Sequence, residues 1–393
     1  METDTTAVHA GRHDLVALGV HAPPIDLSST YPLTDLDAGV AALDELAAGA
    51  AVASSPVYAR LCNPTVRRLE EALAALERAE DAVAFASGMA ALTATLLATC
   101  AERRHVVALR PLYGGSDHLL ACGLLGIEVS WADGVEAIPD ALRDDTGLVL
   151  LETPQNPTLG VIDIAAAVRA SAGVPVAVDN TFATPVLQNP LDHGAALVLH
   201  SATKFLGGHG DVVAGCVMTD GERAAELRRV RILTGGILHP MAAYLLHRSL
   251  PTLPFRVREA QERARALALL LAEQRGVTRV LYPEADGHQL RGPGAVLAFE
   301  LEGGFAAAAA LMGAVRLITP AVSLGSVDSL VQHPAGLTHR LVDPDARAAA
   351  GITDGLLRLA VGLEDVHDLW EDLERGLDAA RAVSPRVGEP AFA

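Results

Sequence analysis

The sequence predicts an α/β protein with a central, mostly parallel sheet, followed by a smaller α+β domain. Short and nearly continuous apolar runs recur between residues 82 and 217, as they do in strands that are buried on both faces of a parallel sheet. Segments with helical periodicity lie between these runs, and this alternation is typical of α/β domains. The expected strands are 82–85, 106–109, 127–129, 148–151, 174–178, 197–199 and 212–217.

The clearest expected helix covers residues 65–80. Its apolar residues recur at intervals of three and four, which places them on one face. Asn63 is suited to cap its N-terminus, and Pro64 is suited to its first position. A second helix is expected at 89–100, directly after the first strand and a glycine. Helices in these places would cover the predicted sheet.

Two further regions flank the predicted α/β domain. Residues 1–50 do not follow the alternation and predict an N-terminal arm, so that the large domain spans 51–235. After Gly235 the pattern changes again, and we expect a small α+β domain at 236–393. Its expected elements are a long helix at 256–274, a strand at 295–301 and a helix at 364–383.

Charge and composition exclude several classes of partner. The net charge of −18 argues against nucleic acid or an anionic membrane as a ligand. The N-terminus lacks the basic and apolar regions of a signal peptide, and no apolar run is long enough to span a bilayer. The four cysteines are far apart, and the 14 histidines show no metal-binding spacing. We therefore expect a cytoplasmic protein that binds no metal.

Lys204 is the only lysine in the sequence, and every other Lys/Arg position is arginine. Arginine keeps its proton in proteins, whereas a deprotonated lysine amine forms Schiff bases with carbonyl compounds. Ser201 and Thr203 precede Lys204, and a glycine-rich stretch follows it. A compositional bias toward arginine would also leave a single lysine at an arbitrary place. The scarcity of lysine alone therefore does not separate a catalytic residue from an incidental one.

Other candidate residues follow the expected strands. Asp179 follows 174–178, Tyr113 follows 106–109 and Asn156 follows 148–151. The string Ser87-Gly88-Met89 follows 82–85 and opens a helix, where free amide groups bind phosphate well. A lysine-bound pyridoxal phosphate requires an anion at its ring nitrogen, a phosphate-binding site and a group over its ring. Each feature alone also fits a simple turn, a helix cap, a packed tyrosine or a rigid loop.

Further strings complete a pattern that runs along nearly the whole chain. They include Tyr58-Ala59-Arg60, Asn63-Pro64-Thr65, Glu152-Thr153-Pro154, Asp179-Asn180-Thr181, Ser201-Ala202-Thr203-Lys204, Ser323-Leu324-Gly325, His333-Pro334-Ala335, Thr338-His339 and Arg358-Leu359. With these strings the chain resembles the Cys/Met-metabolism family of pyridoxal-phosphate enzymes. This family includes cystathionine γ-synthase, cystathionine γ-lyase, methionine γ-lyase and the O-acetylhomoserine sulfhydrylases.

The resemblance implies an aspartate-aminotransferase-type fold (fold type I) and a homotetramer, a dimer of dimers whose active sites are shared across the dimer interface. It implies that Lys204 forms the Schiff base and acts as the base, with Tyr113 over the ring and as the acid. The remaining implied cofactor residues are Asp179 at the ring nitrogen, Gly88, Met89, Ser201 and Thr203 at the phosphate, Asn156, and Tyr58 and Arg60 at the neighbouring subunit's phosphate. The implied substrate residues are Arg358 at the carboxylate, Ser323, Asn156 and Val322.

Two residues bear on which reaction of the family the chain catalyses. Val322 stands where enzymes that act on cystathionine commonly carry glutamate, and an apolar residue favours a thioether tail without a distal charge. We therefore expect α,γ-elimination from a small sulfur amino acid such as L-methionine, with L-cystathionine as a further possible substrate. Gly115 points the other way, because methionine γ-lyases typically have cysteine there. Alternatives are a γ-replacement transferase (cystathionine γ-synthase or O-acyl-homoserine sulfhydrylase) and a non-catalytic binding protein.

Overall fold

The computed structural model describes residues 1–384, and its central feature is a seven-stranded sheet in the order β1-β7-β6-β5-β4-β2-β3. The pairs that link β3, β2, β4, β5 and β6 are parallel, and β7 runs antiparallel to β1 and β6. The predicted α/β fold with a mostly parallel sheet is therefore confirmed. The strands are β1 Asp81–Phe85, β2 His105–Leu109, β3 Glu128–Ala132, β4 Thr146–Glu152, β5 Val176–Asp179, β6 Leu197–His200 and β7 Gly215–Thr219.

The last strand of the large sheet begins three residues later than expected. The strand expected at 212–217 begins at Gly215, and residues 212–214 are not in a strand. The reason is that the backbone of Ala214 binds Thr203 instead of a neighbouring strand. Its carbonyl accepts from the Thr203 amide at 3.2 Å, and its amide donates to the Thr203 hydroxyl at 3.0 Å. This exchange ties the segment before β7 to the loop that carries Lys204.

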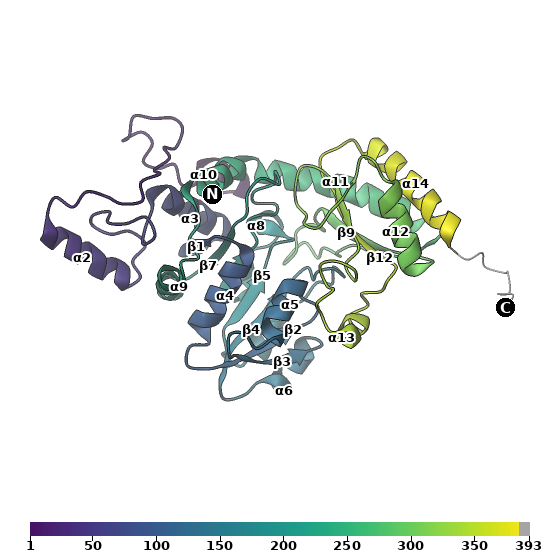
Figure 1. Cartoon of the computed structure of the whole chain (residues 1–393), viewed down its shortest axis with the longest axis horizontal. Helices are drawn as coiled ribbons and strands as arrows, with labels where there is room; N and C mark the ends of the chain where they lie inside the picture. The colour runs from purple at the N-terminus through teal and green to yellow at the C-terminus, as the bar shows by residue number, and fades with distance from the viewer. Residues whose placement is uncertain (385–393) are drawn as a thin grey trace.

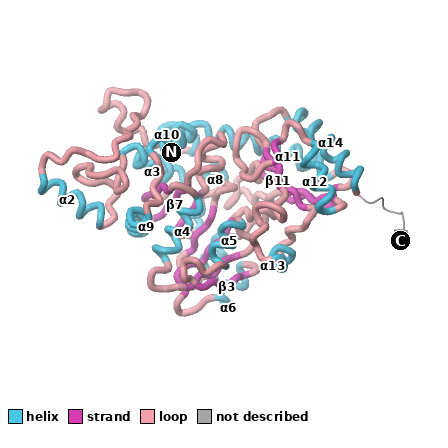
Figure 2. Tube along the Cα trace, viewed as in Figure 1, coloured by secondary structure: helices cyan, strands magenta, loops and turns pink. Residues whose placement is uncertain are grey.

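Helices cover both faces of this sheet (Figure 2). Alternate residues of β2 enter different cores: Val106 and Ala108 belong to the same core as Leu96 and Leu227, whereas Val107 and Leu109 belong to the same core as Ile138 and Ile164. This alternation is what buries a parallel strand on both sides. One face carries α4 (Gly88–Thr99), α5 (Gly114–Ala121) and α9 (Gly221–Thr234), and the other carries α3 (Pro64–Glu77), α6 (Ile138–Ala141), α7 (Ile164–Ala170) and α10 (Pro240–Ser249).

The start of α3 agrees with the sequence prediction. The Asn63 side chain accepts from the amides of Thr65 and Val66, and Pro64 occupies the first turn. Helix α3 ends at Glu77, three residues before the predicted end, because Arg78 adopts a left-handed conformation with φ 60. The shorter helix still buries the face that was expected from its periodicity.

A second sheet of five strands follows in the order β10-β11-β12-β9-β8. Helices α12 and α14 pack against each other beside it. The long helix α11 extends from the core of the large sheet to the core of this second sheet (Figure 1). The domain boundaries at residues 50 and 235 stay predictions, and 385–393 lie outside the described residues. The elements are α11 Leu253–Ala272, β8 Val277–Leu281, β9 Val296–Leu301, α12 Gly304–Ala314, β10 Thr319–Pro320, β11 Leu330–Gln332, α13 Pro344–Ala349, β12 Leu356–Ala360 and α14 Val366–Val383.

The N-terminal region contains two helices that were not predicted from the sequence. Helix α1 (Thr3–His9) packs on α3, and α2 (Leu36–Ala47) stands away from the sheets at the end of long loops (Figure 1). Asp35 caps α2 through the amides of Asp37 and Ala38. The short elements that remain are α8 Thr184–Leu187, η1 Val135–Ala137, η2 Pro190–His193 and η3 Leu250–Thr252. Across residues 1–384, no helix combines the length and the apolar composition that crossing a membrane requires.

Candidate active site

A cavity of about 630 Å³ opens where the parallel strands β4, β5 and β6 end. Ligands of α/β sheets bind at this edge, because the carboxyl ends of the strands and the following loops meet there. Loops of the second sheet close the other side of the cavity. The sequence-predicted residues that line it are Gly88, Met89, Tyr113, Asn156, Asp179, Ser201, Thr203, Lys204, Val322, Ser323 and Arg358.

Lys204 lies in the loop after β6 and points its amine into this cavity. Its Nζ donates to Ser323 Oγ at 2.6 Å. Burial, assisted by the positive charge of Arg358, lowers the pKa of Lys204 from 10.5 to about 8. The amine therefore becomes neutral at a much lower pH than an ordinary lysine, and the neutral form is the one that attacks an aldehyde.

Asp179 ends β5 and stands beside Glu152, its partner in register on β4. Its Oδ1 accepts from the Thr181 amide at 3.0 Å and from the Thr181 hydroxyl at 2.5 Å. Burial raises the pKa of Asp179, while the hydrogen bonds from Thr181 and the charge of His200 act against that rise. A buried carboxylate of this kind is stabilised by a cationic partner, such as a protonated ring nitrogen.

The N-terminus of α4 and the Lys204 loop approach each other closely enough to form an anion site. Ser87 caps α4 by accepting from the Ala90 amide at 3.1 Å. A Cβ added at Gly88 would lie 3.1 Å from Ser201 Cβ, so a larger residue would press on Ser201. Free amides of a helix N-terminus beside hydroxyl groups are suited to a phosphate.

Arg358 is the cation on the opposite side of the cavity, and it is 2% exposed. Its Nη1 donates to Asn156 Oδ1 at 2.9 Å, and its Nη2 donates to the Ser323 carbonyl at 2.8 Å. Burial lowers the pKa of Arg358 to about 10, so the group is still charged at neutral pH. A guanidinium held in place by two partners is suited to bind a carboxylate with both nitrogens.

Tyr113 projects from the start of α5 and is held through its backbone. Its amide donates to Glu152 Oε2 at 2.7 Å. A Cβ added at Gly115 would lie 2.6 Å from Cε1 of Tyr113, so the ring rests over the space that glycine leaves free. The conformation of Tyr113 therefore depends on the identity of residue 115.

Apolar side chains form the outer wall of the cavity. Val322 lines it together with Leu337, Leu341 and Val213. Among the described residues that line the cavity, the carboxyl groups are Glu152 and Asp179, at the ends of β4 and β5 and not in this wall. An uncharged tail fits such a wall, because these apolar side chains offer a distal charged group no partner.

Tyr58 and Arg60 do not line this cavity. Arg60 Nη1 donates to the Ile232 carbonyl at 2.9 Å, and its guanidinium lies 5.5 Å from the centre of the Tyr58 ring. Both residues belong to the segment that joins the N-terminal arm to α3. If Tyr58 and Arg60 contribute to a cavity of this kind, it must be the cavity of another copy of the chain.

The structure also adds residues that sequence reasoning did not select. Glu152, Thr181, Phe182 and His200 line the cavity, and Glu152 is 3% exposed. Burial and the charge of Asp179 raise the pKa of Glu152 well above its usual range. The position of Glu152 at the end of a predicted strand was the one feature of the sequence that pointed to it. That Glu152 lies beside Asp179 is evident only from the register of the two strands.

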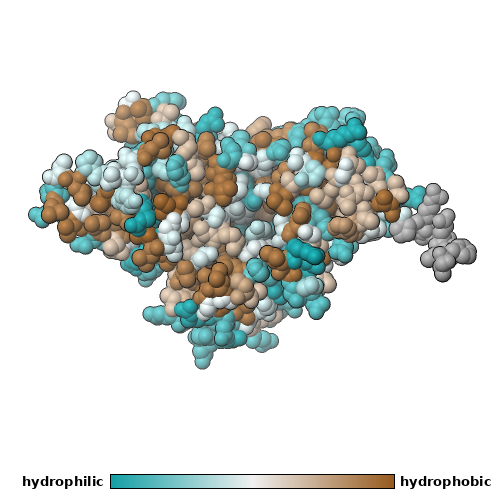
Figure 3. Space-filling model, in the orientation of Figure 1, coloured by the Kyte–Doolittle hydropathy of each residue, from teal (hydrophilic) through white to brown (hydrophobic). Residues whose placement is uncertain are grey.

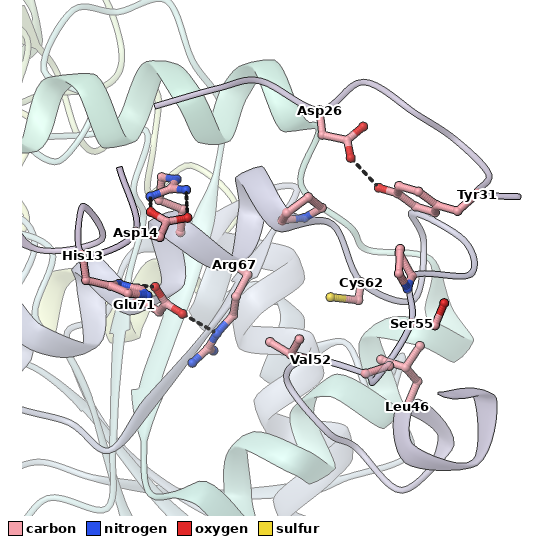
Figure 4. A pocket seen from close by; sticks show the side chains of 14 residues that line it. His13, Asp14, Asp26, Tyr31, Leu46, Val52, Ser55, Cys62, Arg67 and Glu71 are labelled. Carbon is pink, nitrogen blue, oxygen red and sulfur yellow. Dashed lines mark hydrogen bonds and ion pairs between the residues drawn. The ribbon is translucent and has the colours of Figure 1, made fainter. Parts of the chain in front are cut away.

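A second hollow of about 320 Å³ lies between the N-terminal arm and α3 (Figure 4). Its charged groups already have partners within the chain. Arg67 faces Glu71 at 3.4 Å, and Asp26 accepts from the Tyr31 hydroxyl at 3.1 Å. It contains no lysine, and it lies apart from the cavity around Lys204. Across residues 1–384, no group of three or more His, Cys, Asp or Glu side chains is placed to hold a metal ion.

The cavity around Lys204 fits pyridoxal phosphate in each part. Lys204 offers a partly neutral amine for the aldehyde, and Asp179 offers a carboxylate for the ring nitrogen. Gly88 and Ser201 both line the cavity and lie too close together for a larger side chain at residue 88. The amide groups at the start of α4 and the Ser201 hydroxyl are the groups suited to a phosphate. Three independent groups therefore match the three polar parts of this cofactor.

Comparisons with known proteins agree with this chemistry. The model of the family described as Cys/Met metabolism PLP-dependent enzyme matches residues 4–378. The chain is 59% identical to an L-methionine gamma-lyase of Streptomyces avermitilis, over 96% of this chain and 89% of that protein. It is 53% identical to an L-methionine gamma-lyase of Brevibacterium sandarakinum, over 98% and 99% of the two chains. A crystal structure of cystathionine gamma synthase from Xanthomonas oryzae superposes with a TM-score of 0.88 at 39% identity, covering 98% of this chain and 99% of that one.

Proposed function

Because the chain belongs to the family of Cys/Met metabolism PLP-dependent enzymes, we propose that it is a carbon–sulfur lyase that cleaves L-methionine. The reaction is an α,γ-elimination in which methionine and water give methanethiol, 2-oxobutanoate and ammonia. The position of the Lys204 amine in the same cavity as Arg358 is the observation that carries this proposal. Relatives of 59% and 53% identity that are named L-methionine gamma-lyase support the choice of substrate.

Pyridoxal phosphate supplies an electron sink that stabilises the negative charge left on the substrate carbon when a proton is removed. Lys204, Asp179, Gly88, Met89, Ser201 and Thr203 are the residues that would hold it, with Tyr113 and Asn156 at its ring. Asp179 would keep the ring nitrogen protonated. Each of these assignments is a proposal that follows from where the side chains point.

The chain's own groups account for substrate binding and for the proton movements. Arg358 binds the α-carboxylate with a guanidinium that Asn156 and Ser323 hold in place. Lys204 accepts the α-proton on its neutral Nζ and moves it within the cavity, as a general base whose pKa lies near the working pH. Tyr113 stands at the cavity mouth and donates a proton to the departing sulfur. Val322 packs against the methylthio end of the substrate.

The alternative activity is γ-replacement, in which a thiol is added to an activated homoserine. Gly115 favours it, because this residue separates the chain from the pattern typical of methionine γ-lyases. The similarity to a solved structure named cystathionine gamma synthase also supports this alternative. The two activities share every cofactor residue and differ in whether a thiol reaches the substrate before water does.

The distinguishing experiment offers O-acetyl-L-homoserine to the purified holo-enzyme with and without an added thiol. A lyase releases 2-oxobutanoate at a rate that the thiol lowers only slightly. A transferase converts most of the substrate to a thioether once the thiol is present. Predominant thioether formation would replace the proposed lyase activity with the alternative.

The proposal extends to a cytoplasmic homotetramer, a dimer of dimers in which Tyr58 and Arg60 serve the neighbouring subunit. Apolar side chains gather on the surface of the N-terminal arm, as Figure 3 shows. Leu27, Leu33, Leu36, Val40 and Val52 are each at least 48% exposed. A surface of this kind is stabilised by burial against another chain. A sedimentation measurement of the native mass tests the tetramer, and a monomer would contradict it.

A further inference from the structure

His339 lies behind the cavity wall, where three segments of the chain meet. The residue is 0% exposed and does not line the cavity itself. Its Nε2 lies 3.1 Å from the carbonyl oxygen of Leu112 and 3.2 Å from that of Asn156. Leu112 directly precedes Tyr113, and Asn156 binds Arg358. One imidazole therefore contacts both the segment that carries the ring-facing tyrosine and the segment that holds the substrate-binding arginine.

The partners of His339 determine which ring nitrogen carries its proton. Both carbonyl oxygens only accept hydrogen bonds, so Nε2 must be the donor. Nδ1 lies 3.0 Å from the Thr338 hydroxyl and must accept from it. Burial and the charge of Arg358 lower the pKa of His339 to about 4, so the ring is neutral at working pH. A single tautomer satisfies all of these contacts.

Gln332 extends this arrangement back to Arg358. It is in register with Arg358 on the paired strands β11 and β12. With its amide oxygen toward Arg358, it accepts from Nη2 at 3.1 Å and donates to Thr338 Oγ1 at 3.2 Å. Hydrogen bonds then run from Arg358 through Gln332 and Thr338 to His339. Because Arg358 also donates to Asn156 Oδ1, the circuit closes at Asn156.

Backbone packing holds the same segments together. A Cβ added at Gly114 would lie 1.9 Å from the Thr338 carbonyl oxygen, so the loop that carries His339 touches the start of α5. On the other side, the Tyr113 amide is bound by Glu152. A change at His339 is therefore expected to act on Tyr113 and Asn156 through these contacts.

We propose that His339 is a positioning residue, which fixes Tyr113 and the Asn156–Arg358 pair relative to each other through its two carbonyl contacts. This inference rests on the proposed function, because it concerns the geometry of the same cavity. The imidazole itself does not touch the substrate. Catalytic rates respond strongly to such placement, since a displacement of about 1 Å can cost on the order of a hundredfold.

His333 provides a matched control in the same loop. It is also a buried histidine, 5% exposed, with both ring nitrogens engaged. Its Nε2 lies 2.8 Å from the Asp354 carbonyl, and its Nδ1 accepts from the Gly336 amide at 3.0 Å. These partners belong to the second part of the chain and do not line the cavity. Loss of His333 disturbs the loop without releasing Leu112 or Asn156.

The experiment compares His339→Leu, His339→Gln and His333→Leu as holo-enzymes. The measurements are Tm, kcat and KM for L-methionine, and the circular dichroism of the bound cofactor's visible band, which reports the placement of its ring. We expect His339→Leu to lose about tenfold or more in kcat/KM and to change the visible band. Gln can place an amide N–H toward the same carbonyls, so His339→Gln should recover most of both. His333→Leu should lower Tm and leave kcat/KM and the band unchanged.

Equal effects of His339→Leu and His333→Leu on kcat/KM and on the band would overturn the proposal. His339 would then only stabilise the loop. If His339→Leu does not accumulate as folded protein, Thr338→Val and Thr338→Ser replace it. The first removes the hydroxyl that binds Nδ1, and the second keeps it, so only the first should change the band. The visible band does not depend on turnover, so an enzyme that fails to cleave methionine would refute the proposed function without deciding the role of His339.

Discussion

Lys204 Nζ donates a hydrogen bond of 2.6 Å to Ser323 Oγ, so a residue from the loop before β11 holds the amine that follows β6. Ser323 has φ 92, a backbone conformation that is uncommon for a residue other than glycine. A Cβ at the nearby Gly325 would lie 2.6 Å from the Phe205 nitrogen, so this loop packs directly on the residue after Lys204. The two loops therefore set the position of the amine together.

The environment of Lys204 predicts how the apo-enzyme captures its cofactor. The pKa of Lys204 is about 8 instead of 10.5, because burial and Arg358 disfavour the charged amine. Below this pH the amine is protonated and is not a nucleophile, and above it the amine is neutral. The rate of Schiff-base formation should therefore rise with pH up to about 8 and then level off. Stopped-flow absorbance at constant ionic strength measures this rate, and a rise that continues to about pH 10 would show an unperturbed lysine.

Val322 should determine the preference for an uncharged substrate tail. Val322→Glu places a carboxylate in the apolar wall beside Leu337 and Leu341. We expect kcat/KM for L-methionine to fall by about 10- to 100-fold, with a smaller loss for L-cystathionine, whose distal ammonium group can pair with the new charge. Val322→Leu keeps the wall apolar and serves as the control. An unchanged ratio of the two substrates would remove Val322 from the specificity determinants.

Gly115 should be required for the position of the Tyr113 ring. A Cβ there would lie 2.6 Å from Tyr113 Cε1 and 3.3 Å from Met89 Sδ, so Gly115→Ala must displace the ring. We expect kcat for L-methionine to fall about tenfold with little change in Tm. Gly313→Ala in α12 is the control, because no atom lies within 4 Å of its added Cβ. Wild-type activity in Gly115→Ala would mean that Tyr113 does not need this space.

Arg60 should act in the neighbouring subunit's site. Arg60→Ala and Lys204→Ala are each expected to be nearly inactive alone. In mixed dimers, one site receives Lys204 from one chain and Arg60 from the other, so co-expression should restore about a quarter of wild-type activity. The assay compares the mixed preparation with the two separate ones. Activity equal to their mean would place Arg60 outside any shared site.

Much of the large sheet follows from local sequence. The apolar runs predicted all seven strands, and Asn63 and Pro64 predicted where α3 begins. Helices α1 and α2 were not predicted, because the first 50 residues do not share the α/β alternation. The late start of β7 could not be predicted either, because it depends on hydrogen bonds between Ala214 and Thr203, which lie at opposite ends of the connection between β6 and β7.

The candidate site also contains residues that the sequence predicts and residues that it does not. Lys204, Asp179, Tyr113 and Asn156 follow strands, and strand ends of a parallel sheet converge, so their meeting in one cavity follows from the sequence pattern. The contacts of His339 depend on how the second sheet's loops dock on the first. No local pattern encodes that docking, so positioning residues of this kind become visible only in the folded chain.

The most direct test of the proposed function is a product assay of the purified holo-enzyme with L-methionine and, separately, L-cystathionine. The apolar wall at Val322 predicts equimolar methanethiol and 2-oxobutanoate from L-methionine, with a higher kcat/KM than for L-cystathionine. Turnover of L-cystathionine without turnover of L-methionine would contradict the proposal. It would mean that the cavity accepts a charged tail despite its apolar wall.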